Sequence, residues 1–182
     1  MFNLPSPLQK IAHPIASQFG VELFIKRDDL IHPYISGNKW RKLKFNIEKF
    51  KQKKYVSILT FGGAYSNHIA ATAAIGKLLN IPTIGIIRGE ELNINSNKTL
   101  RDAHQNDMKL VFVSRSKYSE RYERFYHEAL RIEFGNTLII NEGGANFHGV
   151  IGSGEILSEI DFTPDYIYAA SGTGTTVAGL LL

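Results

Sequence analysis

Apolar residues occur along this chain in two alternating patterns. Continuous apolar runs, typical of strands buried on both faces, fall at residues 56–63, 83–89, 109–113 and 137–141. Segments with helical spacing fall before or between them, at residues 39–53, 68–80, 97–106 and 117–134. This alternation predicts an α/β fold with a parallel sheet, because strand, helix and strand connect through right-handed crossovers.

The two ends of the chain carry further elements. We expect a short strand at residues 21–26, a loop of turn-forming residues at 28–38, a helix near Val150 and a strand at 165–171. An apolar helix then begins near Val177, and its pattern continues to the last residue without a cap or a polar turn. This ending predicts a truncated chain, or a partner that covers the apolar surface.

Composition narrows the class of protein. Of the 182 residues, 43% are hydrophobic, which is ample for a continuous core. Cysteine is absent, so disulfides, thiolate metal sites and cysteine nucleophiles are excluded. The first residues lack a secretory signal pattern, and no apolar run approaches about 18 residues. We therefore expect a cytoplasmic protein without a membrane partner.

The net charge of +4 raises the possibility of a nucleic-acid partner. However, the lysines between residues 44 and 54 are interleaved with Phe45, Ile47 and Phe50, as on the solvated side of an amphipathic helix. We therefore expect no nucleic-acid partner. A basic nucleic-acid-binding module, with strongly salt-dependent DNA binding, is the alternative of a different class.

Lys39 is the first candidate for chemistry. Asn38 precedes it as a cap residue, so Lys39 falls in the first turn of the predicted helix. Helical spacing places it on the apolar stripe that also holds Leu43, Ile47 and Phe50. Burial and the positive end of the helix dipole both lower the pKa of a lysine, which frees an amine for Schiff-base formation. Spacing alone leaves open that the side chain extends into solvent from a frayed turn.

Two glycine-containing loops are candidate anion sites, because each joins a predicted strand to a predicted helix. At residues 62–68, Ser66 and Asn67 add side-chain donors to the free backbone N–H groups, which suits a carboxylate. The alternative is that one of them only caps the helix. Residues 171–176 offer N–H groups and hydroxyls suited to a phosphate. Val177 stands where a dinucleotide fingerprint has its third glycine, so that motif is excluded.

Two further kinds of site are not indicated. The six histidines show no metal-ligand spacing, so we expect no metal ion. No serine lies in a G-x-S-x-G motif, which disfavours a hydrolase of the nucleophile-elbow type.

Taken together, the candidate segments resemble a known family. SGNKWRKL, FGGAYSNHIAATAA, EGGAN and SGTGTT, in this order, are similar to the 1-aminocyclopropane-1-carboxylate deaminase and D-cysteine desulfhydrase family of tryptophan-synthase-β-like, fold-type-II pyridoxal-phosphate enzymes. The likeness covers almost the whole chain. It implies a three-layer, parallel-sheet α/β fold with two domains, of which the larger is incomplete. Residues 48–142 would form the smaller substrate-binding domain, and residues 1–47 and 143–182 would belong to the larger one.

The resemblance implies pyridoxal 5′-phosphate as the cofactor and Lys39 as its covalent attachment point. Asn67 would hydrogen-bond the phenolic oxygen of the cofactor, and Asn38 would lie against the start of the lysine helix. The loop before the last helix would hold the phosphate, through Gly172, Thr173, Gly174, Thr175 and Thr176.

The implied reaction is that of a deaminase or desulfhydrase acting on a small amino acid, in a homodimer. Lys39 and Ser66 would be catalytic, with Ser66 on the substrate carboxylate beside Tyr65, Asn67 and His68, and with the Lys39 amine moving a proton to or from carbon. Ammonia and a 2-keto acid would be released, from D-cysteine or from 1-aminocyclopropane-1-carboxylate. Tyr65 replaces the glutamine of related loops, so the substrate stays open. A catalytically inactive fragment or assembly partner with this fold is the alternative.

Overall fold

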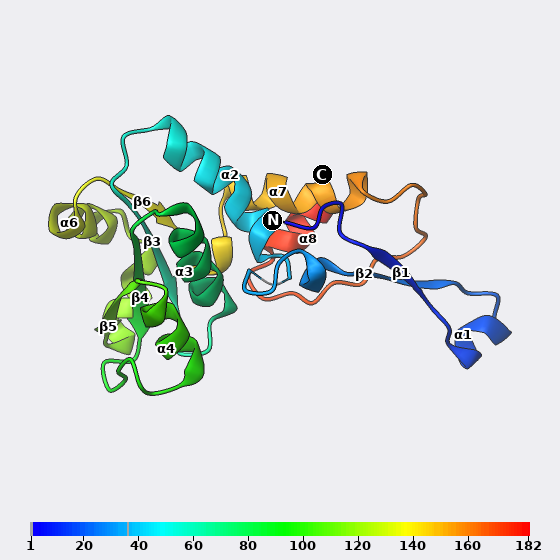
Figure 1. The fold of residues 1–182 in the computed structure, drawn as a ribbon, viewed down its shortest axis with the longest axis horizontal. Helices are drawn as coiled ribbons and strands as arrows, with labels where there is room; N and C mark the ends of the chain where they lie inside the picture. Colours follow the sequence, from blue (N-terminus) through cyan, green and yellow to red (C-terminus); the bar gives the residue numbers. More distant parts are fainter. Residues whose placement is uncertain (1, 36) are drawn as a thin grey trace.

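A four-stranded parallel sheet lies at one end of the structure, a computed structural model that describes residues 2–35 and 37–182 (Figure 1). Its strand order is β5-β4-β3-β6, and every neighbouring pair is parallel. The strands are β3 (Ser57–Gly62), β4 (Thr83–Arg88), β5 (Lys109–Val113) and β6 (Thr137–Ile140). The predicted α/β fold and all four of these predicted strands are confirmed.

Helices cover both faces of this sheet. One face packs against α2 (Lys39–Gln52), α3 (Asn67–Leu79) and α4 (Lys98–Gln105), and the other against α5 (Arg115–Ser119) and α6 (Arg124–Phe134). Successive residues of a strand point to opposite faces. Ile58 of β3 therefore joins the cluster with α2 and α3, whereas Leu59 and Phe61 pack against α5 and α6. Burial on both faces explains why the strands read as continuous apolar runs.

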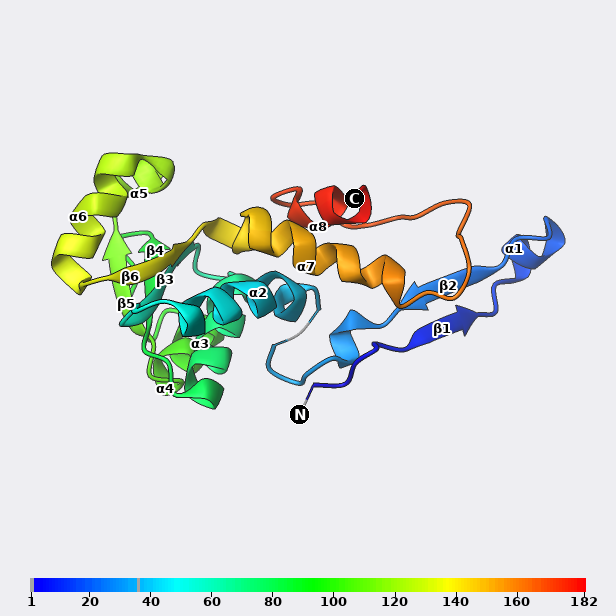
Figure 2. The same ribbon diagram turned by 90° about the horizontal axis from the view of Figure 1, so that it is seen from above.

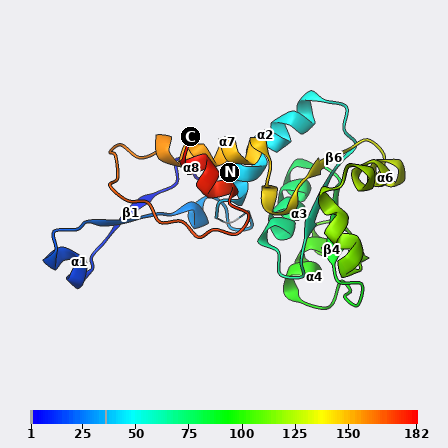
Figure 3. The same ribbon diagram turned by 180° about the vertical axis from the view of Figure 1, so that it is seen from behind.

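A second, more extended part of the molecule lies beyond α2 (Figure 2). Strands β1 (Leu8–Ile11) and β2 (Leu23–Lys26) form an antiparallel ribbon with the short helix α1 (Pro14–Gln18) at its tip. Helix α7 (Phe147–Ser158) packs between α2 and α8 (Thr175–Leu180), and Figure 3 shows α8 against α7. At Gly152 an added Cβ would lie 1.9 Å from the carbonyl oxygen of Arg41, so α2 and α7 can approach this closely only because position 152 is glycine.

The helix predicted at residues 117–134 is wrong as a continuous element. It is divided into α5, the 3-10 turn η2 (Glu120–Tyr122) and α6, with Glu123 in an extended conformation between them. The ring of His127 hydrogen-bonds the carbonyl oxygen of Arg121 (2.7 Å), which satisfies a backbone group that a continuous helix would pair internally. Tyr118 and Tyr126 both reach the same sheet face, so the apolar spacing spans the break.

The strand predicted at residues 165–171 is also wrong. This segment is irregular, and Tyr166 and Tyr168 are largely exposed. A strand exists only where a neighbouring strand accepts its hydrogen bonds, and no strand of the described residues lies beside this segment. Among the helices of residues 2–35 and 37–182, none combines the length and the apolar character needed to cross a membrane.

Candidate active site

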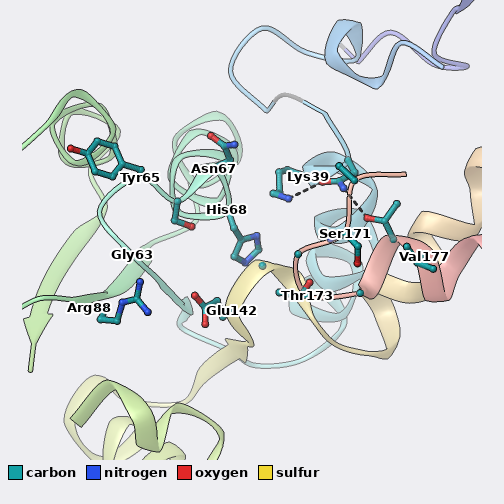
Figure 4. A pocket seen from close by; sticks show the side chains of 18 of the residues that line it. Lys39, Gly63, Tyr65, Asn67, His68, Arg88, Glu142, Ser171, Thr173 and Val177 are labelled. Carbon is teal, nitrogen blue, oxygen red and sulfur yellow. Dashed lines mark hydrogen bonds between the residues drawn. The ribbon is translucent and has the colours of Figure 1, made fainter. Parts of the chain in front are cut away.

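The candidate site lies where the strand order of the sheet reverses. The chain passes from β3 outward to β4 and β5 and then returns to β6 on the other side of β3, so the loops after β3 and β6 leave the sheet in opposite directions. Such a reversal opens a crevice at the carboxyl ends of the strands. A cavity of about 580 Å³ occupies this position, which is a size suited to a small ligand. Helix α2 and the loop before α8 complete its wall (Figure 4).

Lys39 directs its amine into this cavity. It is the first residue of α2, and its Nζ donates a hydrogen bond to Oδ1 of Asn38 (2.8 Å). Leu43 and Ile47, on the same stripe, are buried in the core. Burial lowers the pKa of Lys39 below its ordinary value. The structure therefore excludes the alternative of a frayed lysine extending into solvent.

Asn38 connects the lysine to the glycine-threonine loop. Its side chain makes no cap hydrogen bond to α2 although it occupies the N-cap position. Instead its Oδ1 accepts from Lys39, and its Nδ2 donates to Oγ1 of Thr176 (2.7 Å). The first residue of the motif, Ser36, lies outside the described residues, as does Met1.

Lys42 is a second buried amine in the wall of the cavity. It lies one turn after Lys39, and its pKa falls to about 8 because it is buried and because the charge of Lys39 is near. Neither amine has a carboxylate partner among the described residues. Two uncompensated cations at one wall favour the binding of an anion.

His68 offers a neutral nitrogen beside these amines. Burial and the charges of Lys39 and Lys42 lower its pKa to about 3, so the ring is uncharged at neutral pH. Thr60 donates its hydroxyl hydrogen to the carbonyl oxygen of Ile140 (2.7 Å), so Nε2 of His68 must donate to Thr60 Oγ1 (3.0 Å). Nδ1 of His68 is then an acceptor, and it is buried with no partner among the described residues.

The loop after β3 supplies further cavity residues. Ser66 is the N-cap of α3, and its Oγ accepts from the N–H of Ile69 (3.2 Å), so Ser66 does cap the helix. Its hydroxyl hydrogen is still available to a ligand. Asn67 and His68 line the cavity, whereas Tyr65 is 78% exposed at its rim and is turned away from Lys39 (Figure 4).

The glycine-threonine loop forms the opposite wall, but not with every residue expected. Gly172, Thr173, Gly174 and Thr176 line the cavity. Gly174 has φ +75°, and the space beside it is open, so the backbone can approach a ligand closely. Thr175 is different: its side chain is buried outside the cavity, with its Oγ1 2.9 Å from that of Thr173. Of the five residues expected to hold the phosphate, Thr175 is therefore the one that does not line the cavity.

Sequence reasoning missed three cavity residues, namely Lys42, Arg88 and Glu142. Lys42 could have been found because a residue three positions after Lys39 shares its helix face. Arg88 ends β4 and Glu142 follows β6, and the carboxyl ends of parallel strands meet at one edge. Gly143 has φ +67°, and an added Cβ would lie 2.7 Å from Cγ2 of Thr173, so this glycine lets the loop after β6 touch the threonine loop.

These residues fit pyridoxal phosphate. A phosphate requires cations and backbone N–H groups, and the cavity provides Lys42 and the open glycine-threonine turn. Covalent attachment requires an amine of lowered pKa, which Lys39 provides. The buried, unpartnered Nδ1 of His68 shows that the polar lining is not satisfied by the protein alone.

Comparison with known proteins gives the class directly. The family described as pyridoxal-phosphate dependent enzyme matches residues 2–182, and the chain belongs to that family. It is 31% identical over 181 residues to a Pyrococcus horikoshii protein provisionally named 1-aminocyclopropane-1-carboxylate deaminase, a match covering 97% of this chain and 55% of that protein. It is 30% identical over 197 residues to the mitochondrial bifunctional D-cysteine desulfhydrase/1-aminocyclopropane-1-carboxylate deaminase of Arabidopsis thaliana, covering 99% and 49%.

A solved structure agrees with these relatives. The crystal structure of an ACC deaminase homologue matches with a TM-score of 0.80 at 27% identity, covering 98% of this chain and 56% of that chain. The resemblance, the fold class and the cofactor class inferred from the sequence are thereby confirmed. The chain spans about half the length of the curated relatives that it matches.

Proposed function

We propose that this chain carries the lysine-bearing part of a deaminase or desulfhydrase that uses pyridoxal phosphate and releases ammonia and a 2-keto acid from a small amino acid. The observation that supports it most is the convergence of the Lys39 amine, the Ser66–Asn67 turn and the glycine-threonine loop on one cavity. The names of the relatives suggest 1-aminocyclopropane-1-carboxylate or D-cysteine as the amino acid.

The cofactor would be held by residues from three segments. Lys39 would attach it covalently, and Asn67 would hydrogen-bond its phenolic oxygen. The phosphate would lie on the turn from Gly172 to Gly174, with Thr176 and Lys42 as further donors. When bound, pyridoxal phosphate supplies an electron sink for the bonds at the α-carbon of the substrate.

The chain's own residues would perform the remaining tasks. The Ser66 hydroxyl and the N–H groups at the start of α3 would bind the substrate carboxylate, because its capping bond leaves the hydroxyl hydrogen free. Lys39 would move a proton to or from carbon, and its lowered pKa increases the fraction of neutral amine at physiological pH. Asn38 would hold that amine in position through its bonds to Lys39 and Thr176.

We also propose that residues 48–142 act as a substrate-binding domain and that residues 1–47 and 143–182 belong to a larger cofactor domain. The four parallel strands all fall between Ser57 and Ile140, whereas α7 and α8 pack together beside α2. Movement of the first part toward the second would exclude water from the cavity. Scattering profiles of the full enzyme that stay unchanged on addition of a substrate analogue would contradict this movement.

For the assembly we propose a homodimer in the cytoplasm. Tyr166, Tyr168 and Leu181 are more than 80% exposed, and large exposed apolar side chains are typical of surfaces that other chains cover. The absence of cysteine supports a reducing compartment. Sedimentation equilibrium measures the oligomeric state, and a monomer at micromolar concentration contradicts the homodimer. Fractionation of cells tests the cytoplasmic location.

The main proposal is tested by adding pyridoxal phosphate to the purified chain. We expect a yellow protein whose visible absorbance survives gel filtration and is lost in Lys39→Ala. Lys51→Ala is the matched control, because Lys51 is exposed on the same helix and should leave the absorbance unchanged. Keto-acid release is then measured with D-cysteine, L-cysteine, D-serine and 1-aminocyclopropane-1-carboxylate. A protein that stays colourless, or colour that persists in Lys39→Ala, contradicts the assignment.

A further inference from the structure

A second cavity of about 460 Å³ adjoins the candidate active site along the carboxyl edge of the sheet. The two cavities share one wall, formed by Gly63, Ala64, Tyr65 and Arg88. Arg88 therefore borders both spaces. The second cavity lies immediately beyond the loop proposed to bind the carboxylate of the substrate, in the direction of β5 and α5.

The charge of this cavity is positive and is concentrated on Arg88. Two other arginines border it, but each already has a partner: Arg115 pairs with Glu91 (2.7 Å) and Arg121 with Glu142 (2.8 Å). Arg88 is exposed, and within residues 2–35 and 37–182 its side chain makes no ion pair and no hydrogen bond. Its Nη2 would lie 3.7 Å from a Cβ added at Gly63, beside the turn that lines both cavities.

The second cavity also contains a buried hydroxyl without a partner. Tyr118 is 2% exposed and borders the cavity, and its Oη has no hydrogen-bond partner of ordinary geometry among the described residues. Burial and the nearby Glu142 carboxylate raise the pKa of Tyr118, so its hydroxyl keeps the proton that it can donate. The guanidinium carbons of Arg88 and Arg121 lie 5.8 Å and 4.8 Å from the centre of its ring. A buried hydroxyl that stays unpaired destabilises a protein, and such a group in a native structure calls for a ligand or a bound water as its partner.

We propose that this second cavity binds a second anionic group, a carboxylate or a phosphate, on the side chain of the amino-acid substrate. Arg88 supplies the compensating charge and the hydroxyl of Tyr118 donates a hydrogen bond to it. Glu142 does not repel this group, because its charge is neutralised by Arg121. The proposal rests on the proposed function for the adjoining cavity, and it replaces the neutral amino acids that the names of the relatives suggest with an acidic amino acid that carries a leaving group on its β-carbon.

Binding is tested first, without any reaction. The purified chain is titrated calorimetrically with succinate and with inorganic phosphate, and butyrate serves as the singly charged comparison. We expect Arg88→Gln to weaken succinate binding by about tenfold or more, since a hydrogen bond to a charged group is lost. Arg124→Gln is the matched control, because Arg124 is exposed on α6 outside both cavities, and it should bind succinate like the unmodified chain.

Tyr118→Phe separates binding from folding. It removes only the unpaired hydroxyl, so we expect weaker succinate binding together with a melting temperature that stays the same or rises. A lower melting temperature with unchanged binding contradicts the proposed role of Tyr118. Absence of Arg88-dependent binding of succinate and phosphate overturns the anion site.

The substrate is tested with the cofactor-loaded protein. Both enantiomers of O-phosphoserine are compared with serine by keto-acid release, because loss of phosphate or water from the β-carbon leads to pyruvate and ammonia. Aspartate and asparagine, which lack a leaving group on the β-carbon, are compared only by the visible absorbance change on binding. We expect at least a tenfold preference for an acidic amino acid, lost in Arg88→Gln but retained in Arg124→Gln. Anion binding without this preference overturns the assignment to a substrate and leaves a site for a free anion. Failure of the chain to bind pyridoxal phosphate, with Arg88-dependent succinate binding intact, contradicts only the function of the adjoining cavity.

Discussion

Helix α2 carries buried or half-buried cations on two of its faces, and the surroundings of the two faces differ. On one face, Arg41 is 1% exposed and makes ion pairs with Asp28 and Glu159, both at 2.8 Å. Burial alone would lower the pKa of Arg41, but these hydrogen bonds and charges raise it. Burial would likewise raise the pKa of Glu159, but hydrogen bonds from Arg41 and Lys26 hold it at about 2. Every charge in this cluster has a partner.

The other face of α2 presents Lys39 and Lys42 to the cavity. No carboxylate of the described residues pairs with either amine, and the pKa of each is lowered. A buried charge without a partner reduces stability, and its retention is typical of functional sites. The comparison teaches that burial alone does not reveal the role of a cation. What distinguishes a structural cation from a candidate functional one is whether carboxylates pair with it. The Arg41 cluster connects α2 to the ribbon and to the end of α7, whereas the Lys39–Lys42 pair has no carboxylate partner among the described residues.

The largest expected effect is on the compensated face. Arg41→Met leaves Asp28 and Glu159 without their main partner, so the free energy of unfolding should fall by about 3–5 kcal/mol. Urea denaturation measures it. Arg124→Met, on an exposed arginine, should cost less than about 1 kcal/mol. Adding Asp28→Asn and Glu159→Gln to Arg41→Met should recover much of the loss. A loss similar to that of the control would remove the contrast between the two faces.

On the face that bears Lys39 and Lys42, removal of a cation is expected to raise the free energy of unfolding instead of lowering it. The folded protein holds the Lys42 proton less tightly than the unfolded chain, with a pKa of about 8 against an ordinary value of 10.5, so folding releases a proton between these pH values. Stability from this group therefore rises with pH across that window, by up to about 3 kcal/mol. Lys42→Met should be more stable than the unmodified chain at pH 7, and this advantage should vanish near pH 10.5.

Unfolding curves of the two proteins at a series of pH values measure the Lys42 effect. Lys51→Met, an exposed lysine of α2, should show no comparable pH dependence. If the stability difference between Lys42→Met and the unmodified chain is the same at pH 7 and pH 10.5, the lowered pKa of Lys42 is refuted.

The smallest effect is expected at the start of α3. Ser66→Ala should lower the free energy of unfolding by about 1 kcal/mol because a helix cap is lost, and it should also weaken binding of the amino acid. Ser66→Asp restores the cap but places a negative charge where the substrate carboxylate is proposed to bind. It should therefore recover stability without recovering amino-acid binding. Recovery of both would show that Ser66 acts only as a cap.

The sequence predicted the buried strands β3 to β6 and the helices α2 and α3. It did not predict the break between α5 and α6 or the irregular course of residues 165–171. The apolar runs located β3 to β6 within about a residue, and helical spacing did the same for α2 and α3. The break between α5 and α6 has no glycine or proline to mark it, and it depends on the contact of His127 with the Arg121 carbonyl. Residues 165–171 have the composition of a strand, but pairing depends on a neighbour that local sequence does not describe.

The candidate site also has parts that the sequence predicts and parts that it does not. The motifs around Lys39, Ser66 and Gly172 were recognisable because glycines, hydroxyls and a lysine occur at strand-to-helix junctions, where backbone N–H groups are free. Thr175 belongs to such a motif, yet its side chain turns toward α7. Its direction depends on how α8 packs, which the motif does not contain.

The order of buried and solvated positions along the chain was therefore enough to specify the parallel α/β architecture and the loops that line the candidate site, since periodicity and turn chemistry are local properties. Folding decided which loops share a cavity, and it brought Lys42, Arg88 and Tyr118 beside them from separate elements. Whether a buried charge is compensated depends on residues more than 100 positions away, as between Arg41 and Glu159. Such pairings arise only when the chain has folded, because charge and burial act through space.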